Sequence, residues 1–82
     1  MSLLKTLSGH PGSVYAIAFS PDSKHLATGS VGGIIHIWDT SNWNCIKTIS
    51  NFCGSIYSLD YSPNGMYLAS GCGDGTVKIF VI

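Results

Sequence analysis

The sequence contains two similar segments, residues 12–39 and residues 54–81. Each residue of the first segment has its counterpart at the same distance along the chain, the step from Gly12 to Gly54, which we call the repeat offset. Residues 12–23, GSVYAIAFSPDS, align with residues 54–65, GSIYSLDYSPNG; residues 24–39, KHLATGSVGGIIHIWD, align with residues 66–81, MYLASGCGDGTVKIFV. Identical Gly, Ser, Tyr and Pro residues stand at equal offsets, and several differences exchange similar apolar side chains. A match of this length does not arise from composition alone, so we expect two copies of one supersecondary unit.

Each copy is a series of short strands separated by turn signals. The first copy predicts four strands, at Val14–Phe19, His25–Ser30, Ile34–Trp38 and Cys45–Ile49. The second predicts three more between Ile56 and Ile82. Pro fixes φ at a turn position and Gly supplies positive φ, which predicts turns at Pro21-Asp22, Gly32-Gly33, Pro63-Asn64 and Asp74-Gly75. No helical period occurs, so the fold class is all-β.

The third predicted strand is apolar on both faces, because Ile34 and His36 alternate with Ile35 and Ile37. A sheet with two apolar faces has to be covered on both sides by other parts of the protein. Four-stranded sheets that recur about every 40 residues describe the blades of a β-propeller.

The chain resembles the WD-repeat family over essentially its whole length. The resemblance rests on SGH (8–10), FSPDS (19–23), LATGS (26–30), IWD (37–39), YSPNG (61–65), LASG (68–71) and DGTVKIF (74–80). It implies antiparallel four-stranded propeller blades. A narrower resemblance is to the middle blades of the superkiller-complex WD-repeat subunits, which are scaffolds in cytoplasmic RNA surveillance and in a transcription-elongation complex.

The resemblance also implies a hydrogen-bonded set that locks each blade. The residues that correspond to it are His10, Thr28, Trp38 and Asp39 in the first copy, and Ser70 and Asp74 in the second. Gly32 replaces the turn Asp in the first copy, while Phe52 and Phe80 replace the His and the Trp in the second. We therefore expect His10 and Asp74 to be buried without partners, and Gly32→Asp to complete the first set.

Leu3–Leu7 matches the last strand of a unit, so one, four and three strands make eight: two four-stranded blades cut out of phase. The predicted unit spans 1–82, with an outer strand at 3–7, a first repeat at 8–50 and a second repeat at 51–82 that lacks its outer strand. Two blades cannot close a ring. The chain is therefore either a fragment of a larger propeller or a unit that forms a ring with other copies.

The composition excludes several classes of function. Lys plus Arg equals Asp plus Glu at four each, so no basic patch suggests direct nucleic-acid binding. The longest apolar run is too short to span a membrane, and the first residues lack the features of a signal peptide. Three cysteines without a CxxC motif fit a reducing interior, with Cys45, Cys53 and Cys72 as inert thiols. We expect an intracellular protein, cytoplasmic, nuclear or both.

No catalytic motif is present, and His10, His25 and His36 lack metal-ligand spacing. Residues 71–75, GCGDG, predict a turn because no helix follows to bind a phosphate. Asp60 would either line a channel or, more commonly, be solvated. We expect a chain that is not an enzyme and that has no catalytic residue, metal or cofactor.

The resemblance implies a non-catalytic scaffold that binds other proteins within a multi-protein complex, with no direct nucleic-acid or membrane partner. The alternative is a unit whose role is to assemble with copies of itself. Tyr15 and Tyr57 would either anchor a partner or pack between the blades. The positions implied as partner-binding are Ser13, Tyr15, Val31, Ser55, Tyr57 and Gly73.

Overall fold

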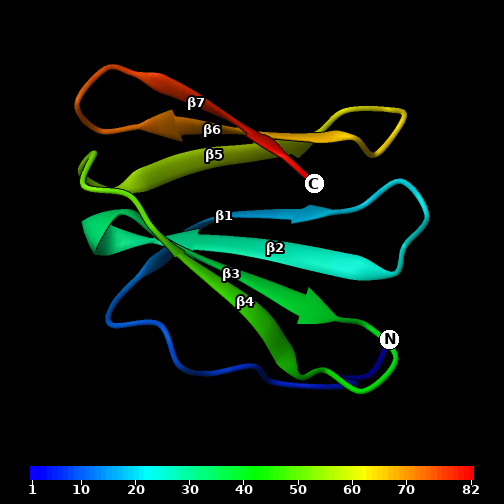
Figure 1. Cartoon of the computed structure of the whole chain (residues 1–82). Helices are drawn as coiled ribbons and strands as arrows, with labels where there is room; N and C mark the ends of the chain where they lie inside the picture. Colours follow the sequence, from blue (N-terminus) through cyan, green and yellow to red (C-terminus); the bar gives the residue numbers. More distant parts are fainter.

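The computed structural model describes all 82 residues, with seven β-strands in two antiparallel sheets. The first sheet contains β1 (Val14–Phe19), β2 (His25–Ser30), β3 (Ile34–Asp39) and β4 (Cys45–Ser50), and the second contains β5 (Ile56–Tyr61), β6 (Tyr67–Cys72) and β7 (Val77–Val81). Strands neighbour one another in sequence order in both sheets (Figure 1). The all-β prediction is confirmed, and the four strands of the first copy end within one residue of their predicted bounds.

The Pro turns use the same hydrogen bonds in both copies. The Ser20 hydroxyl donates to Asp22 Oδ1 (2.6 Å), and the Ser62 hydroxyl donates to Asn64 Oδ1 (2.7 Å). Each acceptor also accepts the backbone N–H two residues later, at 2.9 Å in both copies. These side-chain bonds close the turn without a partner from elsewhere in the chain. The turns predicted at Pro21-Asp22 and Pro63-Asn64 are confirmed.

The glycine turns differ between the copies. Gly32 and Gly33 both have positive φ (78° and 77°), and Val31–Gly33 forms one 3₁₀ turn between β2 and β3. In the second copy residues 73–76 connect β6 to β7, and within this turn only Gly75 has positive φ (88°). Turns therefore form at both predicted positions, Gly32-Gly33 and Asp74-Gly75, within loops of three and four residues. No helix in the structure is long and apolar enough to cross a membrane.

The predicted strand at Leu3–Leu7 does not form, so the structure has seven strands and not eight. A β-strand is stable only when its backbone groups pair with a neighbouring strand. This segment lies beside the first sheet but pairs with no strand edge there, and Leu3 and Leu4 remain 83% and 84% exposed.

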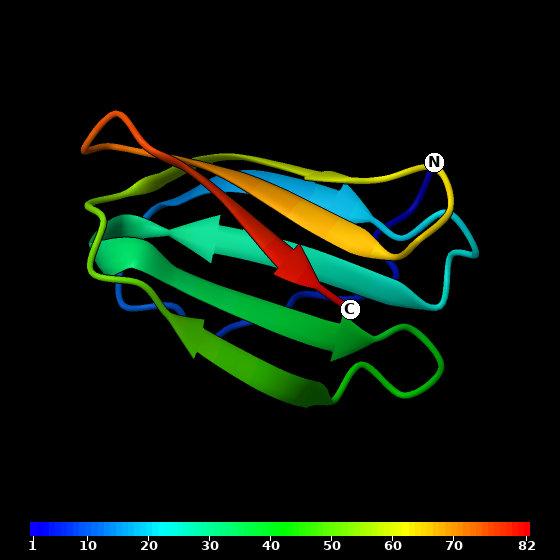
Figure 2. The same cartoon turned by 45° about the horizontal axis from the view of Figure 1, so that its top comes forward.

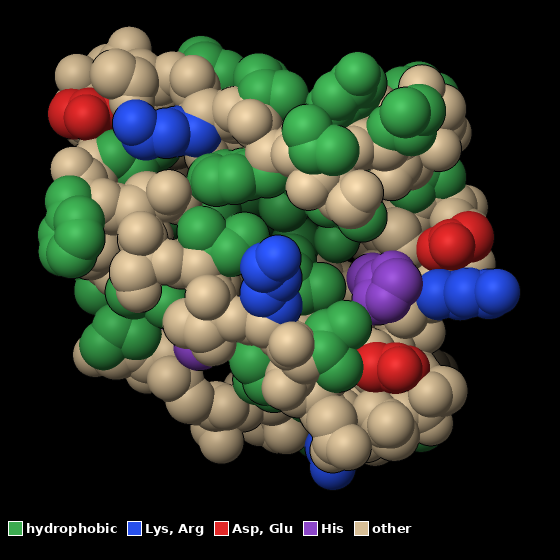
Figure 3. Space-filling view, in the orientation of Figure 1, with side chains coloured by type: hydrophobic (Ala, Val, Ile, Leu, Met, Phe, Trp, Pro, Cys, Tyr) green, Lys and Arg blue, Asp and Glu red, His purple; other side chains and the backbone are tan.

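The two sheets pack face to face, with the second lying over the first (Figures 1 and 2). β5 lies against β1 and β2, where Ile56 and Leu59 pack on Gly29. The core between the sheets contains Ala16, Ala27, Ile35, Ile37, Cys53, Ile56, Tyr61, Leu68 and Cys72. A groove of about 310 Å³ separates the sheets between β4 and β7, where Figure 3 shows hydrophobic side chains gathered in a hollow.

Candidate protein-binding site and the ties that support it

Tyr15 and Tyr57 lie next to each other at the start of β1 and β5. The strand pairing shifts between Val14 and Ala16 and again between Ile56 and Ser58, so each tyrosine is at a β-bulge. At a β-bulge a side chain no longer follows the regular alternation between the two faces of the sheet, so it points in a different direction. The rings are 5.3 Å apart between centroids and tilted by 42°, and the side chains stay 50% and 58% exposed. They therefore pack across the two sheets and also present a joint aromatic surface.

The structure brings three of the implied partner-binding residues together in the second copy. Gly73 N–H donates to Ser55 O at 2.9 Å, and a Cβ placed on Gly73 would lie 3.3 Å from a ring carbon of Tyr57. In the first copy, Val31 is half-buried against Gly12, next to the exposed Ser13. All six positions lie at one end of the sheets, where β1 and β5 begin and the 31–33 and 73–76 turns lie (left in Figure 1).

His10 is held on the first sheet by a chain of hydrogen bonds. Trp38 Nε1–H donates to Thr28 Oγ1 (2.9 Å), which is itself 2.5 Å from His10 Nε2. His10 Nδ1 lies 2.8 Å from Ser30 Oγ. The predicted set contains His10, Thr28 and Trp38 but omits Ser30. The expectation that His10 lacks partners is wrong, because Ser30, two residues beyond Thr28 on β2, points to the same face.

These contacts suit a neutral imidazole. Since the Thr28 oxygen accepts from Trp38, its own O–H is free to donate to His10 Nε2, and Nδ1–H then donates to Ser30. Burial lowers the pKa of His10 below 6.5, and the nearby His36 lowers it further. The two imidazole rings lie 4.2 Å apart between centroids. His10 is therefore uncharged at neutral pH.

The aspartates of the implied set are turn caps. Asp74 is exposed and accepts from Thr76 N–H (3.0 Å) and Thr76 Oγ1–H (2.6 Å), and Asp39 accepts in the same way from Ser41 at 2.8 and 2.6 Å. The Thr76 hydroxyl bond is the main reason why the pKa of Asp74 lies below its ordinary value. The expectation that Asp74 is buried and unpartnered is therefore wrong.

Gly32→Asp would not complete a set around His10. His10 already has two partners, and a Cβ on Gly32 would meet no atom within 4 Å. Gly32 also has φ of 78°, a conformation that an aspartate adopts only at a cost. The geometry therefore gives no reason to expect a gain in stability from this substitution.

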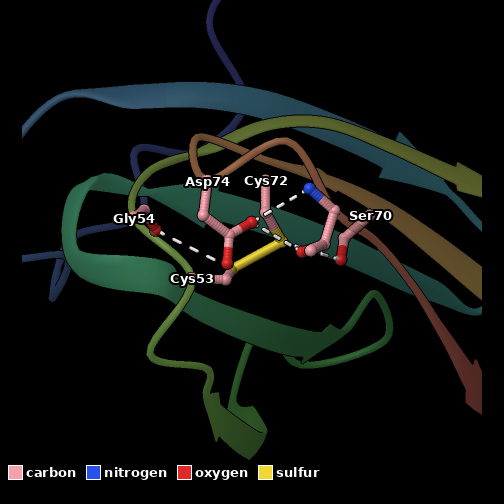
Figure 4. The surroundings of a disulfide bond; sticks show 6 residues. Cys53, Gly54, Ser70, Cys72 and Asp74 are labelled. Carbon is pink, nitrogen blue, oxygen red and sulfur yellow. Dashed lines mark hydrogen bonds between the residues drawn. A yellow bond between two sulfur atoms is a disulfide. The ribbon is translucent and has the colours of Figure 1, made fainter.

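Cys53 and Cys72 form a disulfide, with Cα atoms 5.6 Å apart, and the expectation that both are separate thiols is wrong (Figure 4). Cys72 ends β6, and Cys53 lies in the loop that enters β5. Ser70, buried on the same strand as Cys72, has its hydroxyl 3.9 Å from Cys72 Sγ. Cys45 is the free cysteine and is exposed.

The disulfide occupies the same place in the second copy as the His10–Ser30 hydrogen bond in the first. At the repeat offset, Cys72 is the counterpart of Ser30, and Cys53 is the counterpart of the residue that follows His10. Asp74 N–H also donates to Cys53 O (3.0 Å), which ties the β6–β7 turn to the same loop. Both copies thus fasten the loop before their first strand to the end of their second strand. These ties hold the loops that precede Tyr15 and Tyr57.

The remaining polar residues include no cluster of potential metal ligands. Asp60 is exposed on the face of the second sheet that points away from the first, and no group of three or more His, Cys, Asp or Glu side chains could hold a metal ion. The site is therefore a surface of two aromatic rings beside backbone turns. Such a surface can bury large area against another protein while each ring orders few rotatable bonds.

Comparison with known proteins gives the class of this fold. The sequence matches the WD40 family, described as "WD domain, G-beta repeat", over residues 1–39 and 43–80. The chain belongs to the WD40 repeat family. Domains of this family are generally protein-interaction scaffolds and are typically non-catalytic.

The similar proteins are of several kinds. The chain is 44% identical over 43 residues to the WD repeat-containing protein AAC3 of Dictyostelium discoideum, which covers 52% of the chain and 9% of that protein. It is 51% identical over 39 residues to Protein HIR1 of Kluyveromyces lactis (48% of the chain, 4% of that protein) and 45% identical over 40 residues to human Striatin-4 (49% and 5%). The chain spans less than a tenth of each of these relatives.

Proposed function

We propose that the chain is a non-catalytic scaffold module that binds a partner protein within a multi-protein complex through the end of the sheets that carries Tyr15 and Tyr57. The observation that supports this proposal is the pair of tyrosines at matching bulges, half-exposed and in contact with each other. Bulges that re-aim a side chain are features that folds retain for a purpose. Two amphipathic rings held in fixed positions suit an interface anchor.

Affinity capture tests this role. Wild-type chain and a Tyr57→Ser variant are used to capture proteins from an extract of the source cells, with quantitative mass spectrometry of the bound fraction. We expect a stoichiometric partner whose recovery falls with Tyr57→Ser. Asp60→Asn, on the same strand but outside this surface, is the matched control and should leave recovery unchanged. A partner retained equally by all three proteins would contradict the proposed surface.

Within the family, we propose the narrower placement with the superkiller-complex WD-repeat subunits. It rests on the first repeat with Gly32 in the turn and the second with Phe52 and Phe80. The relatives described above are varied and do not favour this placement over others. The captured partners would test it, since components of an RNA-surveillance or transcription-elongation complex should be among them.

We propose an intracellular location, cytoplasmic, nuclear or both, with no direct nucleic-acid or membrane partner and no cofactor. In a reducing compartment Cys53 and Cys72 would be present as two thiols beside each other. Extraction without a reductant, alkylation in denaturant and mass measurement should then show labelling of all of Cys45, Cys53 and Cys72, because unfolding exposes the two buried thiols. Labelling of Cys45 alone would indicate an oxidising compartment.

A second candidate function is self-association, and the exposed outer faces of the sheets favour it. Ile17 and Phe19 on the first sheet and Val77 and Ile79 on the second are 57–71% exposed. Contiguous apolar surfaces of this kind mark interaction sites. The formal charge of zero provides little repulsion between copies. Light scattering of the purified chain distinguishes the two functions, since a scaffold that does not self-associate should have a mass of 8.7 kDa.

A further inference from the structure

The disulfide joins two segments that both contribute to the surface proposed for partner binding, called the tyrosine surface below. Cys53 lies two residues before Ser55, in the loop that enters β5, and Cys72 directly precedes Gly73, in the turn that leaves β6. Gly73 N–H donates to Ser55 O at 2.9 Å, and Asp74 N–H donates to Cys53 O at 3.0 Å. Figure 4 shows the sulfur bridge between this loop and this turn. The covalent link therefore lies next to the tyrosine surface.

The turn that follows Cys72 packs beside the ring of Tyr57. A Cβ on Gly73 would lie 3.3 Å from a ring carbon of Tyr57. A Cβ on Gly54, the residue after Cys53, would lie 3.4 Å from the Gly73 Cα. The loop, the turn and the ring are thus in close contact, so a shift of the loop relative to the turn would change the position of the ring.

Opening of the disulfide would free the loop and leave the sheets in place. Cys72 is held at the end of β6 by its pairing with Ile56, whereas Cys53 lies outside all strands. Cys53 and Cys72 are 1% and 8% exposed and belong to the core between the sheets. Two thiols at these positions would stay close, since the Cα atoms are 5.6 Å apart, within the range of an ordinary disulfide. The bond can therefore open and form again without a rearrangement of the strands.

The first copy contains no cysteine at the corresponding positions, which are Pro11 and Ser30. Its loop before β1 is fastened by the hydrogen bond between His10 and Ser30. Mild oxidants and thiols do not break a bond of this kind. A redox change would therefore act on the loop of the second copy and leave the loop before Tyr15 unchanged.

We propose that Cys53 and Cys72 are a reversible redox modification site that controls the tyrosine surface. The inference rests on the proposed scaffold function and adds the regulation of its binding site. In the oxidised form the disulfide holds the loop before β5 against the 73–76 turn, so the Tyr57 half of the surface is already ordered for a partner protein. In the dithiol form the loop moves more freely, and binding has to order it, which lowers the affinity.

A peroxide is the class of oxidant that suits two buried thiols, because it is small. The thiolate of Cys72, the more exposed of the two residues, attacks one oxygen of hydrogen peroxide: an S–O bond forms, the O–O bond breaks, and the leaving hydroxide takes up a proton to give water. The Cys53 thiolate then attacks the sulfenic sulfur, so the S–S bond forms and a second water leaves. The two electrons and two protons lost by the cysteines end in these waters. A dithiol reductant restores both thiols by exchange.

The first experiment needs no partner and uses the chain with Cys45→Ser, which removes the exposed free thiol. An equimolar amount of hydrogen peroxide is added to the reduced chain, and its mass should fall by two hydrogen atoms without a gain of oxygen. NMR order parameters are then measured for both forms. We expect residues 51–55 to be rigid after oxidation, at about 0.85, and to move toward the flexible range below about 0.6 after reduction with dithiothreitol. Residues 9–13 are the internal control and should be the same in both forms.

The second experiment measures partner recovery from an extract of the source cells prepared without a reductant. The linked bait is the oxidised Cys45→Ser chain, and the unlinked bait also carries Cys53→Ser and Cys72→Ser. We expect recovery to be roughly tenfold lower with the unlinked bait. The reduced Cys45→Ser chain, used with dithiothreitol present, is a second unlinked bait without a substitution in the core. The oxidised chain with Tyr57→Ser is the control that keeps the link but loses the ring.

The outcomes separate the redox control from the proposed function. A gain of oxygen in place of the disulfide, or equal order parameters of residues 51–55 in the two forms, overturns the redox control without reference to any partner. Equal recovery by the linked and unlinked baits also overturns it, and the proposed function stands if Tyr57→Ser still lowers recovery. Failure of every bait to capture a partner overturns the proposed function and its regulation together.

Discussion

At the scale of single residues, His10 makes the stability of the first sheet depend on pH. Its pKa is lowered in the folded chain, so the unfolded chain binds more protons as the pH falls below the ordinary histidine value of about 6.5. The stabilising contribution is present above that pH and is lost below it. The turn aspartates do not interfere, because their pKa values are also lowered and they stay ionised in this window.

We therefore expect the melting temperature to decrease between pH 7.5 and pH 5.5, and His10→Gln to flatten this decrease. Thermal unfolding followed by circular dichroism at several pH values measures it. His25→Gln is the matched control, because the His25 side chain is outside the Trp38–Thr28–His10–Ser30 chain. An unchanged pH profile in His10→Gln would show that the imidazole is not held as described.

A second prediction at the residue scale compares the same turn position in the two copies of the repeat. Ser23 and Gly65 are counterparts at the repeat offset and occupy the same turn position, with positive φ of 62° and 72°. A non-glycine residue in this conformation costs about 1–2 kcal/mol. Gly65→Ser should therefore destabilise the chain by about 1 kcal/mol, since the added Cβ meets only ordinary contacts at 3.9 Å from Pro21.

Ser23→Gly should stabilise the chain by less than about 1 kcal/mol, because glycine also gains entropy in the unfolded chain. Urea unfolding of the two variants beside the wild type measures both effects. The prediction is wrong if the two substitutions shift the unfolding midpoint in the same direction.

The residue scale also shows what sequence reasoning could not reach. The recurrence of Tyr15 and Tyr57 identifies a repeated role, but the bulges depend on strand register, which the pattern of apolar residues does not specify. The case of Ser30 is different, because the side-chain period of two puts it on the same face as Thr28 and hence beside His10. That signal is present in the sequence, although the predicted set omits this residue.

At the scale of elements, the sequence predicts the strand pattern well wherever a partner strand exists in the chain. Residues 3–7 carry the same pattern as β4, yet only β4 has an edge beside it. The Cys53–Cys72 pair is missed for a related reason. Counting cysteines and their spacing gives no sign that β6 returns to the loop before β5.

The disulfide gives an element-scale prediction. Its cysteines are 19 residues apart, and closing a loop of this size is worth about 3 kcal/mol by the chain-entropy estimate. The double variant Cys53→Ala/Cys72→Ala should lose about 2–4 kcal/mol of unfolding free energy. Cys45→Ala, at the exposed free thiol, is the control and should change it little.

A reducing agent should lower the wild-type stability toward that of the double variant and leave the double variant unaffected. Chemical unfolding with and without the reductant is the measurement. Equal stability of the wild type in both conditions would mean that the covalent tie contributes nothing beyond the packing of the two sulfurs.

At the scale of the whole molecule, the contact between the sheets depends on the absence of a side chain at Gly29. A Cβ there would collide with Ile56, a buried residue on the facing strand. We expect Gly29→Ala to destabilise the chain by about 1–3 kcal/mol through overpacking. At the equivalent Gly71 a Cβ would meet mainly the hydroxyl of the exposed Ser58, which can rotate away.

Gly71→Ala is therefore the matched control in the isolated chain and should cost clearly less than Gly29→Ala. Differential scanning calorimetry at low protein concentration compares them. Similar losses in the two variants would mean that β5 does not rest on β2 as closely as the structure shows.

The sheets approach each other closely at β1 and β5 and stand apart at β4 and β7, where the groove lies. The spacing between the two sheets is therefore small along their first strands and large along their last strands. If further sheets were stacked with the same spacing, the stack would not be straight but would curve toward the side of the first strands. The tilt between neighbouring sheets is set here by small residues such as Gly29 and Ala16 beneath β5. This tilt would then determine how many sheets make a full turn, and whether the stack closes into a ring or continues as an open helix.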